Sequence, residues 1–399
     1  MKKRLAVGAV AFLLSIQQGF AQAPGFDAWL AGFRAEAAAA GVSAAVIDNA
    51  LSGLSVNQRV YELNDNQPEF TRAIWDYLDT AVSETRIANG RAKLADHARL
   101  LDLIERAYGV DAETLVAIWG LESAYGEVLG DFDAIQALAT LAFEGRRTGY
   151  GRSQLIGALK IIDNGHAARD QLKGSWAGAM GHTQFIPTTY LAYAVDHDSD
   201  GRRDIWSNLG DVFASTANYL SVSGYRANER WGVEVTIPAG FDFSLADVST
   251  RKPVVEWSAL GVAAAAGPAL TARLDPNLRG RIIVPAGANG PAFMVFGNFE
   301  AILKYNRSTA YALAVAMLSD KAGGDDAPIT GAWPRDDRPL ALSERKALQQ
   351  ALADKGYKPG PADGIIGANT RKALRAWQRD QGLPADGYAS AAVLEALGS

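Results

Sequence analysis

The sequence predicts a mainly α-helical protein that carries a small β-containing insertion and ends in a separate helical module. From Phe26 to about Tyr225, apolar residues recur at the 3.6-residue spacing of helices that bury one face. From about residue 231 to residue 296, short β-type runs are broken by glycine and proline. Residues 341–399 form a compact unit behind a segment rich in glycine, proline and aspartate. A chain of 399 residues, 48% of them hydrophobic, is long enough for this organisation.

The N-terminal residues 1–21 have the pattern of a signal peptide. Two lysines and an arginine precede an apolar run from Leu5 to Ile16, and small residues favour cleavage after Ala21. The run is shorter than the roughly 20 apolar residues of a membrane span, and we expect no other span. The chain contains no cysteine, which excludes a lipid-modified cysteine and disulfides. We therefore expect an exported, periplasmic protein that is soluble after cleavage.

The charge of the chain argues against two classes of partner. The net charge is −5, and removing residues 1–21, with three positive charges and no acidic ones, takes it to −8. A mildly acidic protein without a basic run is a poor ligand for nucleic acid or for an anionic membrane surface. We expect a neutral or zwitterionic partner.

The main domain is predicted to span residues 24–320. In "RAYGVDAETLVAIWG", Asp111 can cap a helix whose first turn contains Glu113. The β-type runs of the insertion include "WGVEVTIPAG" and "GRIIVPAGANGPAFMVFG". The later segment "NFEAILKYNRSTAYALAVAMLSD" has helical spacing again. Because that helix needs a partner face, we expect an insertion within one helical domain rather than a separate β domain.

Residues 321–340 are predicted to be a linker, and the unit behind them contains a weak internal repeat. The segment "PADGIIGANTRKAL" resembles "PADGYASAAVLEAL": each has a glycine-containing turn, a Ser or Thr suited to helix entry, and an amphipathic helix. Small units of this kind on a linker usually bind rather than catalyse.

A single carboxylate, Glu122, interrupts the apolar and aromatic stretch "IWGLESAYGE". If this stretch is helical, the residues on the same face are Leu115, Ile118, Trp119 and Tyr125. One interpretation places Glu122 at the edge of the apolar stripe or beside a basic partner. The other is a carboxyl that aromatic neighbours desolvate, with a pKa raised enough for general acid catalysis near neutral pH.

Two further motifs, "GSWAGAMGHTQFIPTTY" and "KYNRS", contain neutral polar groups, small residues and aromatic rings. "GSWAGAMGHTQFIPTTY" has glycines at 174, 178 and 181, which let backbone approach a bound ligand closely. For His182, inside this motif, a packing role is favoured over a place in a cleft. Aromatic faces stack on sugar rings and neutral polar groups bind hydroxyls and acetamides, so the set suits a sugar. The neutral polar candidates are Ser175, Gln184, Tyr305 and Asn306.

These motifs, taken in order, resemble the soluble lytic murein transglycosylase B family over about residues 25–320. The resemblance implies a lysozyme-like helical fold. It also implies cleavage of the β-1,4 bond between N-acetylmuramic acid and N-acetylglucosamine, with a 1,6-anhydro-muramic end as product. By resemblance, Glu122 is the catalytic acid/base and Ser175 orients the substrate acetamide or the acid. The other cleft residues that it implies are Gln184, Tyr305, Asn306, Tyr150, Tyr219 and Tyr77.

The family's mechanism needs only one acid, whereas most glycosidases use two carboxylates. Glu127, five residues after Glu122, lies about 140° around the helix and is not on its face. The resemblance implies that Glu122 protonates the bridging oxygen and that the substrate acetamide stabilises the developing cation. Glu122 would then take the proton of the muramic C6 hydroxyl as it attacks C1. A hydrolytic muramidase and a non-catalytic wall-binding protein remain the alternatives.

The loop "DHDSDGRRD", residues 196–204, begins like an EF-hand, with Asp at the first, third and fifth positions. The motif departs from that pattern at position twelve, which is Ser207 rather than Glu. The resemblance implies that Ca²⁺ can occupy the loop in a structural role; the alternative is a solvated acidic turn. The chemistry itself is expected to need no cofactor. The candidate ligands are Asp196, Asp198, Asp200 and Asp211.

The C-terminal unit, residues 341–399, resembles a three-helix peptidoglycan-binding domain. This resemblance implies peptidoglycan glycan strands as the partner, while a partnership with cell-wall synthesis proteins stays open. A tethered module of this kind raises the local concentration of substrate around the catalytic domain. The residues that carry the resemblance are Asp363, Gly364, Gly367, Thr370, Ala373, Leu374, Trp377, Gln378, Leu383, Asp386 and Gly387.

Overall fold

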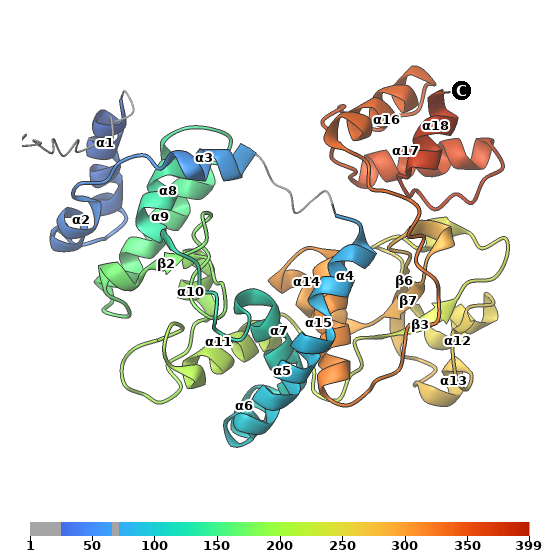
Figure 1. The fold of residues 1–399 in the computed structure, drawn as a ribbon, viewed down its shortest axis with the longest axis horizontal. Coiled ribbons are helices and arrows are strands. Elements are labelled where there is room, and N and C mark those ends of the chain that lie inside the picture. Colours follow the sequence, from blue (N-terminus) through green and yellow to red (C-terminus); the bar gives the residue numbers. More distant parts are fainter. Residues whose placement is uncertain (1–24, 66–71, 399) are drawn as a thin grey trace, which may run out of the picture.

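The computed structural model describes residues 25–65 and 72–398, and it confirms the predicted fold class (Figure 1). Helices dominate, one small sheet is inserted among them, and the chain ends in a helical module. The predicted signal peptide, residues 1–21, lies outside the described residues. Among the helices of the described ranges, none combines the length and the apolar character needed to cross a membrane.

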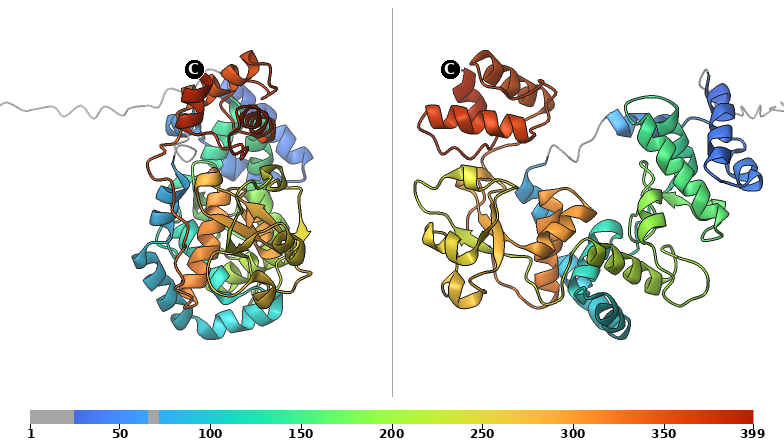
Figure 2. Two further views of the ribbon diagram at one scale, coloured as in Figure 1. Left: turned by 90° about the vertical axis from the view of Figure 1, so that its right-hand side faces the viewer. Right: turned by 180° about the vertical axis from the view of Figure 1, so that it is seen from behind.

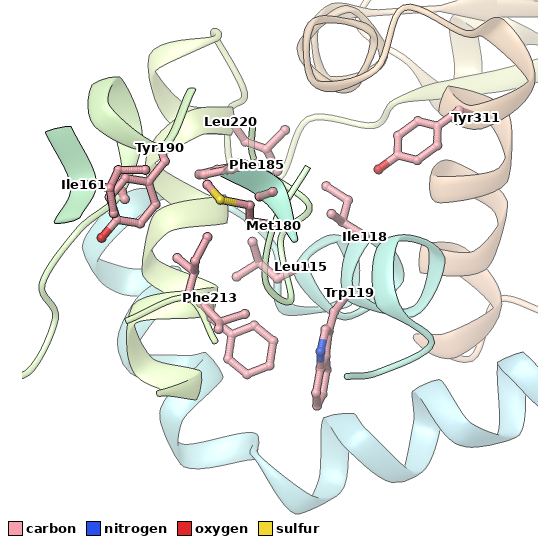
Figure 3. Packing of buried hydrophobic residues seen from close by; sticks show 14 of the residues in the cluster. Leu115, Ile118, Trp119, Ile161, Met180, Phe185, Tyr190, Phe213, Leu220 and Tyr311 are labelled. Carbon is pink, nitrogen blue, oxygen red and sulfur yellow. The ribbon is translucent and has the colours of Figure 1, made fainter. Parts of the chain in front are cut away.

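Apart from the helix of residues 58–65, the helices that precede the sheet share one large apolar core with the two helices that follow it. In Figure 3, α7 lies in the middle of this core, and its side chains pack against residues of the glycine-rich segment and of α11. A two-stranded antiparallel ribbon, β1 (Phe132–Asp133) and β2 (Lys173–Gly174), begins that segment. The helices are α1 (Phe26–Ala39), α2 (Ala44–Leu51), α3 (Gln58–Asp65), α4 (Ile74–Ala81), α5 (Glu84–Asp96), α6 (Ala98–Tyr108), α7 (Ala112–Ser123), α8 (Ala134–Phe143), α9 (Thr148–Asp163), α10 (Pro187–Tyr193) and α11 (Leu209–Val222).

The inserted sheet is antiparallel, with strand order β4-β6-β7-β3-β5, and it has a core of its own. The fully buried Trp257 lies in this core, and its indole N–H donates to the carbonyl of Gly280 at 2.9 Å. After the sheet, α14 (Gly297–Tyr305) and α15 (Thr309–Ala322) return to the helical domain, where α15 packs along α7. The elements of the insertion are β3 (Gly232–Thr236), β4 (Lys252–Pro253), α12 (Val254–Ala259), β5 (Ala263–Ala264), α13 (Leu270–Arg273), β6 (Arg279–Ile283) and β7 (Ala292–Val295).

The internal repeat of the C-terminal module corresponds to two equivalent turns. The module consists of α16 (Leu342–Asp354), α17 (Ala368–Asp380) and α18 (Ala391–Gly398). A buried glutamine of the preceding helix holds each turn. The Oε1 of Gln349 accepts from the N–H of Gly364, and the Oε1 of Gln378 accepts from that of Gly387. Both glycines have positive φ, 82° and 71°, which explains the glycine in each copy.

The connecting segment, residues 323–341, has no helix or strand, yet it is fixed to the body of the protein (Figure 2). The carboxylate of Glu234 on β3 accepts from the backbone N–H groups of Thr330 and Gly331, at 2.8 and 2.7 Å. Arg335 makes two hydrogen bonds to Asp79 on α4, at 2.7 and 3.0 Å. The segment predicted to be a linker is therefore docked along the domain.

The C-terminal module also contacts the inserted sheet region directly. The carboxylate of Asp386 accepts from the backbone N–H of Ala288 at 2.7 Å. Arg375 lies 3.6 Å from the carboxylate of Asp247. These contacts and the docked connecting segment together fix the module beside the sheet, as Figure 1 shows.

Candidate active site

Glu122 lies in the last turn of α7, a helix that is buried on nearly all sides. Its predicted neighbours Leu115, Ile118 and Trp119 are indeed buried on this helix. Tyr125 is not on the helix face, because α7 ends at Ser123 and the chain then reverses. The reversal uses three consecutive positive φ angles, at residues 124, 125 and 126. The expectation that the helix continues through Tyr125 was therefore wrong.

The Glu122 carboxyl is half-buried and is held by one hydrogen bond. The hydroxyl of Tyr311 donates to its Oε1 at 2.7 Å. Burial raises the pKa of Glu122 from its ordinary 4.5 to about 7, and the hydrogen bond from Tyr311 opposes this only in part. Neither cause of the shift is another charged group. The carboxyl thus matches the second interpretation of the sequence, a desolvated acid that titrates near neutral pH.

Tyr311 is the functional residue that sequence reasoning missed. It lies in the first turn of α15, where the Oγ of Ser308 accepts from its backbone N–H. Its ring is buried, and in Figure 3 the phenol points from α15 towards α7. The "RSTAY" capping pattern could have located the start of this helix. Only the packing of α15 along α7 reveals that the hydroxyl reaches Glu122.

Tyr305 and Tyr77 belong to the same cluster. Burial, and then the nearby Glu122 carboxylate, raise the pKa of both Tyr305 and Tyr311. Tyr77 is near enough to Tyr311 to contribute to that residue's raised pKa. The hydroxyl of Tyr305 donates to the carbonyl of Thr183 at 2.7 Å. This bond joins the end of α14 to the glycine-rich segment.

Tyr219 lies behind Tyr305 and supports it. Their rings meet edge to face with centroids 5.0 Å apart, and Phe185 packs against both. The hydroxyl of Tyr219 donates to the carbonyl of Lys304 at 2.6 Å. Asn306, at the end of α14, is exposed, and its Oδ1 accepts from the backbone N–H of Ser308. Of these residues, Asn306 is the one open to solvent.

Ser175, Tyr150 and Gln184 order the glycine-rich segment itself. The Oγ of Ser175 accepts from the N–H of Ala179 at 3.0 Å, and the hydroxyl of Tyr150 donates to the carbonyl of Ala177 at 2.8 Å. Gln184 has a left-handed backbone with φ 49°, and its amide donates to the carbonyls of Leu129 and Gly181. The contacts of Ser175 and Tyr150 lie within the segment that they shape.

The three glycines of this segment permit close packing against the protein itself. We expected them to let backbone approach a ligand, but the neighbours that a Cβ would meet are protein atoms. A Cβ at Gly174 would lie 2.0 Å from the carbonyl oxygen of Ala179, and one at Gly181 2.6 Å from that of Ile205. Their first role is therefore to allow the segment to pack closely on itself at Gly174 and on neighbouring parts of the protein at Gly178 and Gly181.

Three of the four predicted metal ligands converge. Asp196, Asp198 and Asp211 each place a carboxylate oxygen within 4.8 Å of the others. Burial raises the pKa of Asp211, and the charges of Asp198 and Asp196 raise it further. Asp200 is not in this group, and its carboxylate accepts from the backbone N–H of Arg202. Converging carboxylate oxygens are a donor set suited to Ca²⁺.

Comparison with known proteins gives two family matches and several close structures. The family model described as "Transglycosylase SLT domain" matches residues 25–320, and the model described as "Putative peptidoglycan binding domain" matches residues 342–397. The membrane-bound lytic murein transglycosylase B of Escherichia coli strain K12 is 30% identical over 275 residues, which is 65% of this chain and 72% of that protein.

Among solved structures, SltB3 from Pseudomonas aeruginosa in complex with NAG-anhNAM-pentapeptide has a TM-score of 0.91 and 50% identity. The match covers 94% of this chain and 100% of SltB3. The Escherichia coli transglycosylase Slt35 in complex with calcium has a TM-score of 0.64 and 27% identity. That match covers 76% of this chain and 94% of Slt35.

Proposed function

The chain belongs to the transglycosylase SLT family and is a lytic murein transglycosylase, and we propose that it forms 1,6-anhydro-muramic ends with Glu122 as its single acid/base. Its substrate bond is the β-1,4 link between N-acetylmuramic acid and N-acetylglucosamine in peptidoglycan. The observation that carries the proposal is the Glu122 carboxyl. Burial raises its pKa to about 7, and it accepts a hydrogen bond from the neutral phenol of Tyr311. The peptidoglycan-binding module and the predicted signal peptide support action on the wall in the periplasm.

In the first step, protonated Glu122 donates its proton to the bridging oxygen as the bond from that oxygen to C1 breaks. A pKa of about 7 keeps a large part of the carboxyl protonated near neutral pH, which an ordinary glutamate would not achieve. The 2-acetamido group of the muramic acid stabilises the developing positive charge, as in substrate-assisted glycosidases. No second carboxylate is needed for this step.

In the second step, the C6 hydroxyl of the same sugar attacks C1, and the Glu122 carboxylate takes its proton. The new bond from C1 to O6 closes the anhydro ring, the proton returns to Glu122, and no water is consumed. The hydrogen bond from Tyr311 favours the ionised carboxyl between the steps. Because the pKa of Glu122 lies near the working pH, the group can act first as an acid and then as a base.

The predicted cleft residues have two roles in this proposal. Tyr305 and Tyr77 belong to the cluster around the acid, where aromatic faces can stack on sugar rings, and Tyr219 supports Tyr305 from behind. The neutral polar groups bind hydroxyls and acetamides of the strand, and Tyr150 supports the segment that presents two of them, Ser175 and Gln184. These neutral polar residues are Ser175, Gln184 and Asn306.

The carboxylate cluster is proposed to hold a structural calcium ion. Slt35, a relative in fold and sequence, has been solved in complex with calcium. In this chain Asp196, Asp198 and Asp211 would hold the ion, with further oxygen ligands from the loop. Bound calcium would neutralise the charges that now raise the pKa of Asp211. It would order the loop and take no part in the chemistry.

Mass spectrometry of peptidoglycan digested by the purified protein tests the product. We expect muropeptides with anhydro-muramic ends, which are lighter by one water than hydrolysed ends. Products with reducing muramic ends would contradict the proposal and indicate a muramidase. Binding to sacculi without release of muropeptides would indicate a non-catalytic wall protein.

Tyr311→Phe is expected to move the alkaline limb of the pH–rate profile to higher pH. The phenol hydrogen bond favours the ionised carboxyl, so its loss raises the pKa of Glu122 further above about 7. Glu122 then stays protonated, and the acid step continues, at higher pH. The measurement is kcat/KM on soluble glycan strands between pH 5 and 9. Tyr219→Phe is the matched control, because the hydroxyl that it removes bonds to Lys304 and not to Glu122. If the alkaline limb has the same apparent pKa in both variants, the role of Tyr311 is refuted.

A further inference from the structure

His182 joins the end of the catalytic helix to the loop of residues 204–206 through four hydrogen bonds. Its backbone N–H donates to the carbonyl of Ile205 at 2.9 Å, and its carbonyl accepts from the hydroxyl of Ser123 at 3.1 Å. Its Nδ1 accepts from the indole N–H of Trp119 at 2.8 Å, and its Nε2 lies 3.1 Å from the carbonyl oxygen of Trp206. One side chain therefore contacts both sides of a single junction.

The two ring contacts define one tautomer of His182. An indole N–H can only donate, so Nδ1 must be the unprotonated acceptor. A carbonyl can only accept, so the ring proton must be on Nε2, facing Trp206. Burial lowers the pKa of His182, which keeps this neutral form in place at physiological pH. The ring is thus a fixed connector with one donor and one acceptor.

The residues that His182 holds flank Glu122 closely in sequence. Trp119 is one helical turn before Glu122, and Ser123 follows it directly. Directly after Ser123 the chain reverses through Ala124 and Tyr125, with φ angles of 49° and 61°. Left-handed backbone is unfavourable for residues other than glycine, so this end of the helix needs external support.

Gly126 completes the reversal against the histidine ring. With φ 89° it passes so close that a Cβ there would lie 2.3 Å from Cε1 of His182. The indole of Trp119 also packs against the ring of His182, with ring centroids 5.9 Å apart. The turn therefore packs directly against the ring of His182 at Gly126.

We propose that His182 is a positioning residue for the reaction: it clamps the end of α7 to the loop 204–206 and so fixes the direction of the Glu122 carboxyl. The inference rests on the proposed role of Glu122 as acid/base. The clamp also reaches the carboxylate cluster, because the backbone N–H of Asp204 donates to Asp211 at 2.6 Å. A change in the order of the loop 204–206 would therefore change the position of the Glu122 carboxyl.

Trp119→Phe tests the clamp with Trp29→Phe as a matched control. The indole N–H of Trp29 is buried without a hydrogen-bond partner among the described residues, so its loss breaks no bond. We expect W119F to lower kcat on glycan strands by ~10- to 100-fold with little change in KM, as a small misplacement of a catalytic group does. W29F should keep wild-type kcat. Equal kcat values for the two variants would overturn the proposal.

A second pair of variants leaves the indole in place. His182→Asn keeps an acceptor near the position of Nδ1, whereas His182→Leu has a similar size and no acceptor. We expect H182N to retain at least ~5-fold more kcat than H182L, and the double variant W119F/H182L to be no worse than H182L alone. Equal losses in H182N and H182L, or additive losses in the double variant, would overturn the clamp. Should W119F fail to fold, this pair decides the question.

The outcome for Glu122→Gln separates the two levels of inference. Wild-type turnover in E122Q would remove the proposed function and the positioning role with it. Inactive E122Q beside fully active W119F and H182L would overturn the positioning role alone. Thermal unfolding of each variant, followed by circular dichroism, identifies any loss of kcat that comes from unfolded protein.

Discussion

Glu122→Gln is expected to lower kcat by ~10²- to 10⁴-fold, the usual contribution of a general acid/base. Glutamine has the shape of the protonated carboxyl and can still accept the hydrogen bond from Tyr311. It cannot give a proton to the bridging oxygen or take one from the C6 hydroxyl. Both steps therefore lose their proton carrier, while sugar binding, and with it KM, should change little. The measurement is the initial rate of muropeptide release.

Glu127→Gln provides the matched control for this variant. Glu127 is exposed and follows the turn that ends α7, so it should tolerate the same change with kcat within about twofold of wild type. If E122Q kept more than about a tenth of wild-type kcat, Glu122 could not be the acid. If both variants lost activity equally, the effect would come from net charge and not from the site.

The same substitution is expected to stabilise the fold above neutral pH. The pKa of Glu122 is raised from 4.5 to about 7 in the folded protein, so its protonated form is the one that folding favours. The contribution of Glu122 to the free energy of unfolding is therefore full below pH 4.5. It is lost as the pH rises through 7, a decrease of up to about 3 kcal/mol. Glutamine stays neutral at every pH and avoids this loss.

Denaturant unfolding at several pH values measures this effect. The midpoint of E122Q should exceed that of wild type at pH 8, and the difference should shrink towards pH 4. A common midpoint at pH 8 would show that the folded protein carries the ionised carboxyl without cost. Together with the loss of turnover, a gain in stability would mark Glu122 as a residue kept for its chemistry.

The fold class was predictable because helical spacing and β-type runs are local patterns. The end of α7 was not, because Ala124 and Tyr125 are poor candidates for left-handed backbone. Distant contacts override that local preference: the hydroxyl of Tyr125 donates to the carbonyl of Arg86 at 2.7 Å, and Gly126 packs against the ring of His182. Tertiary contacts of this kind leave no periodic trace in the sequence.

The acid itself was visible as a lone carboxylate in an apolar stretch, whereas its hydrogen-bond partner was not. Tyr311 is 189 residues away along the chain, and its contact depends on how α15 packs against α7. The glycine-rich motif was recognisable, but its close contacts are internal to the protein. Similarly, the EF-hand spacing selected Asp200, whose carboxylate the structure directs to Arg202.

The docked connecting segment changes how the wall-binding module can assist catalysis. A loose tether would let the module search a sphere around the domain, and the local concentration of substrate would fall as the tether became longer. Here the segment is hydrogen-bonded to Glu234 and Asp79, and Asp386 of the module is hydrogen-bonded to Ala288 in the sheet region. These bonds prevent the module from moving freely around the domain. A glycan held by the module must then meet Glu122 from one direction and at one separation. A module that binds glycan in this fixed position would present strands to the catalytic domain in one orientation.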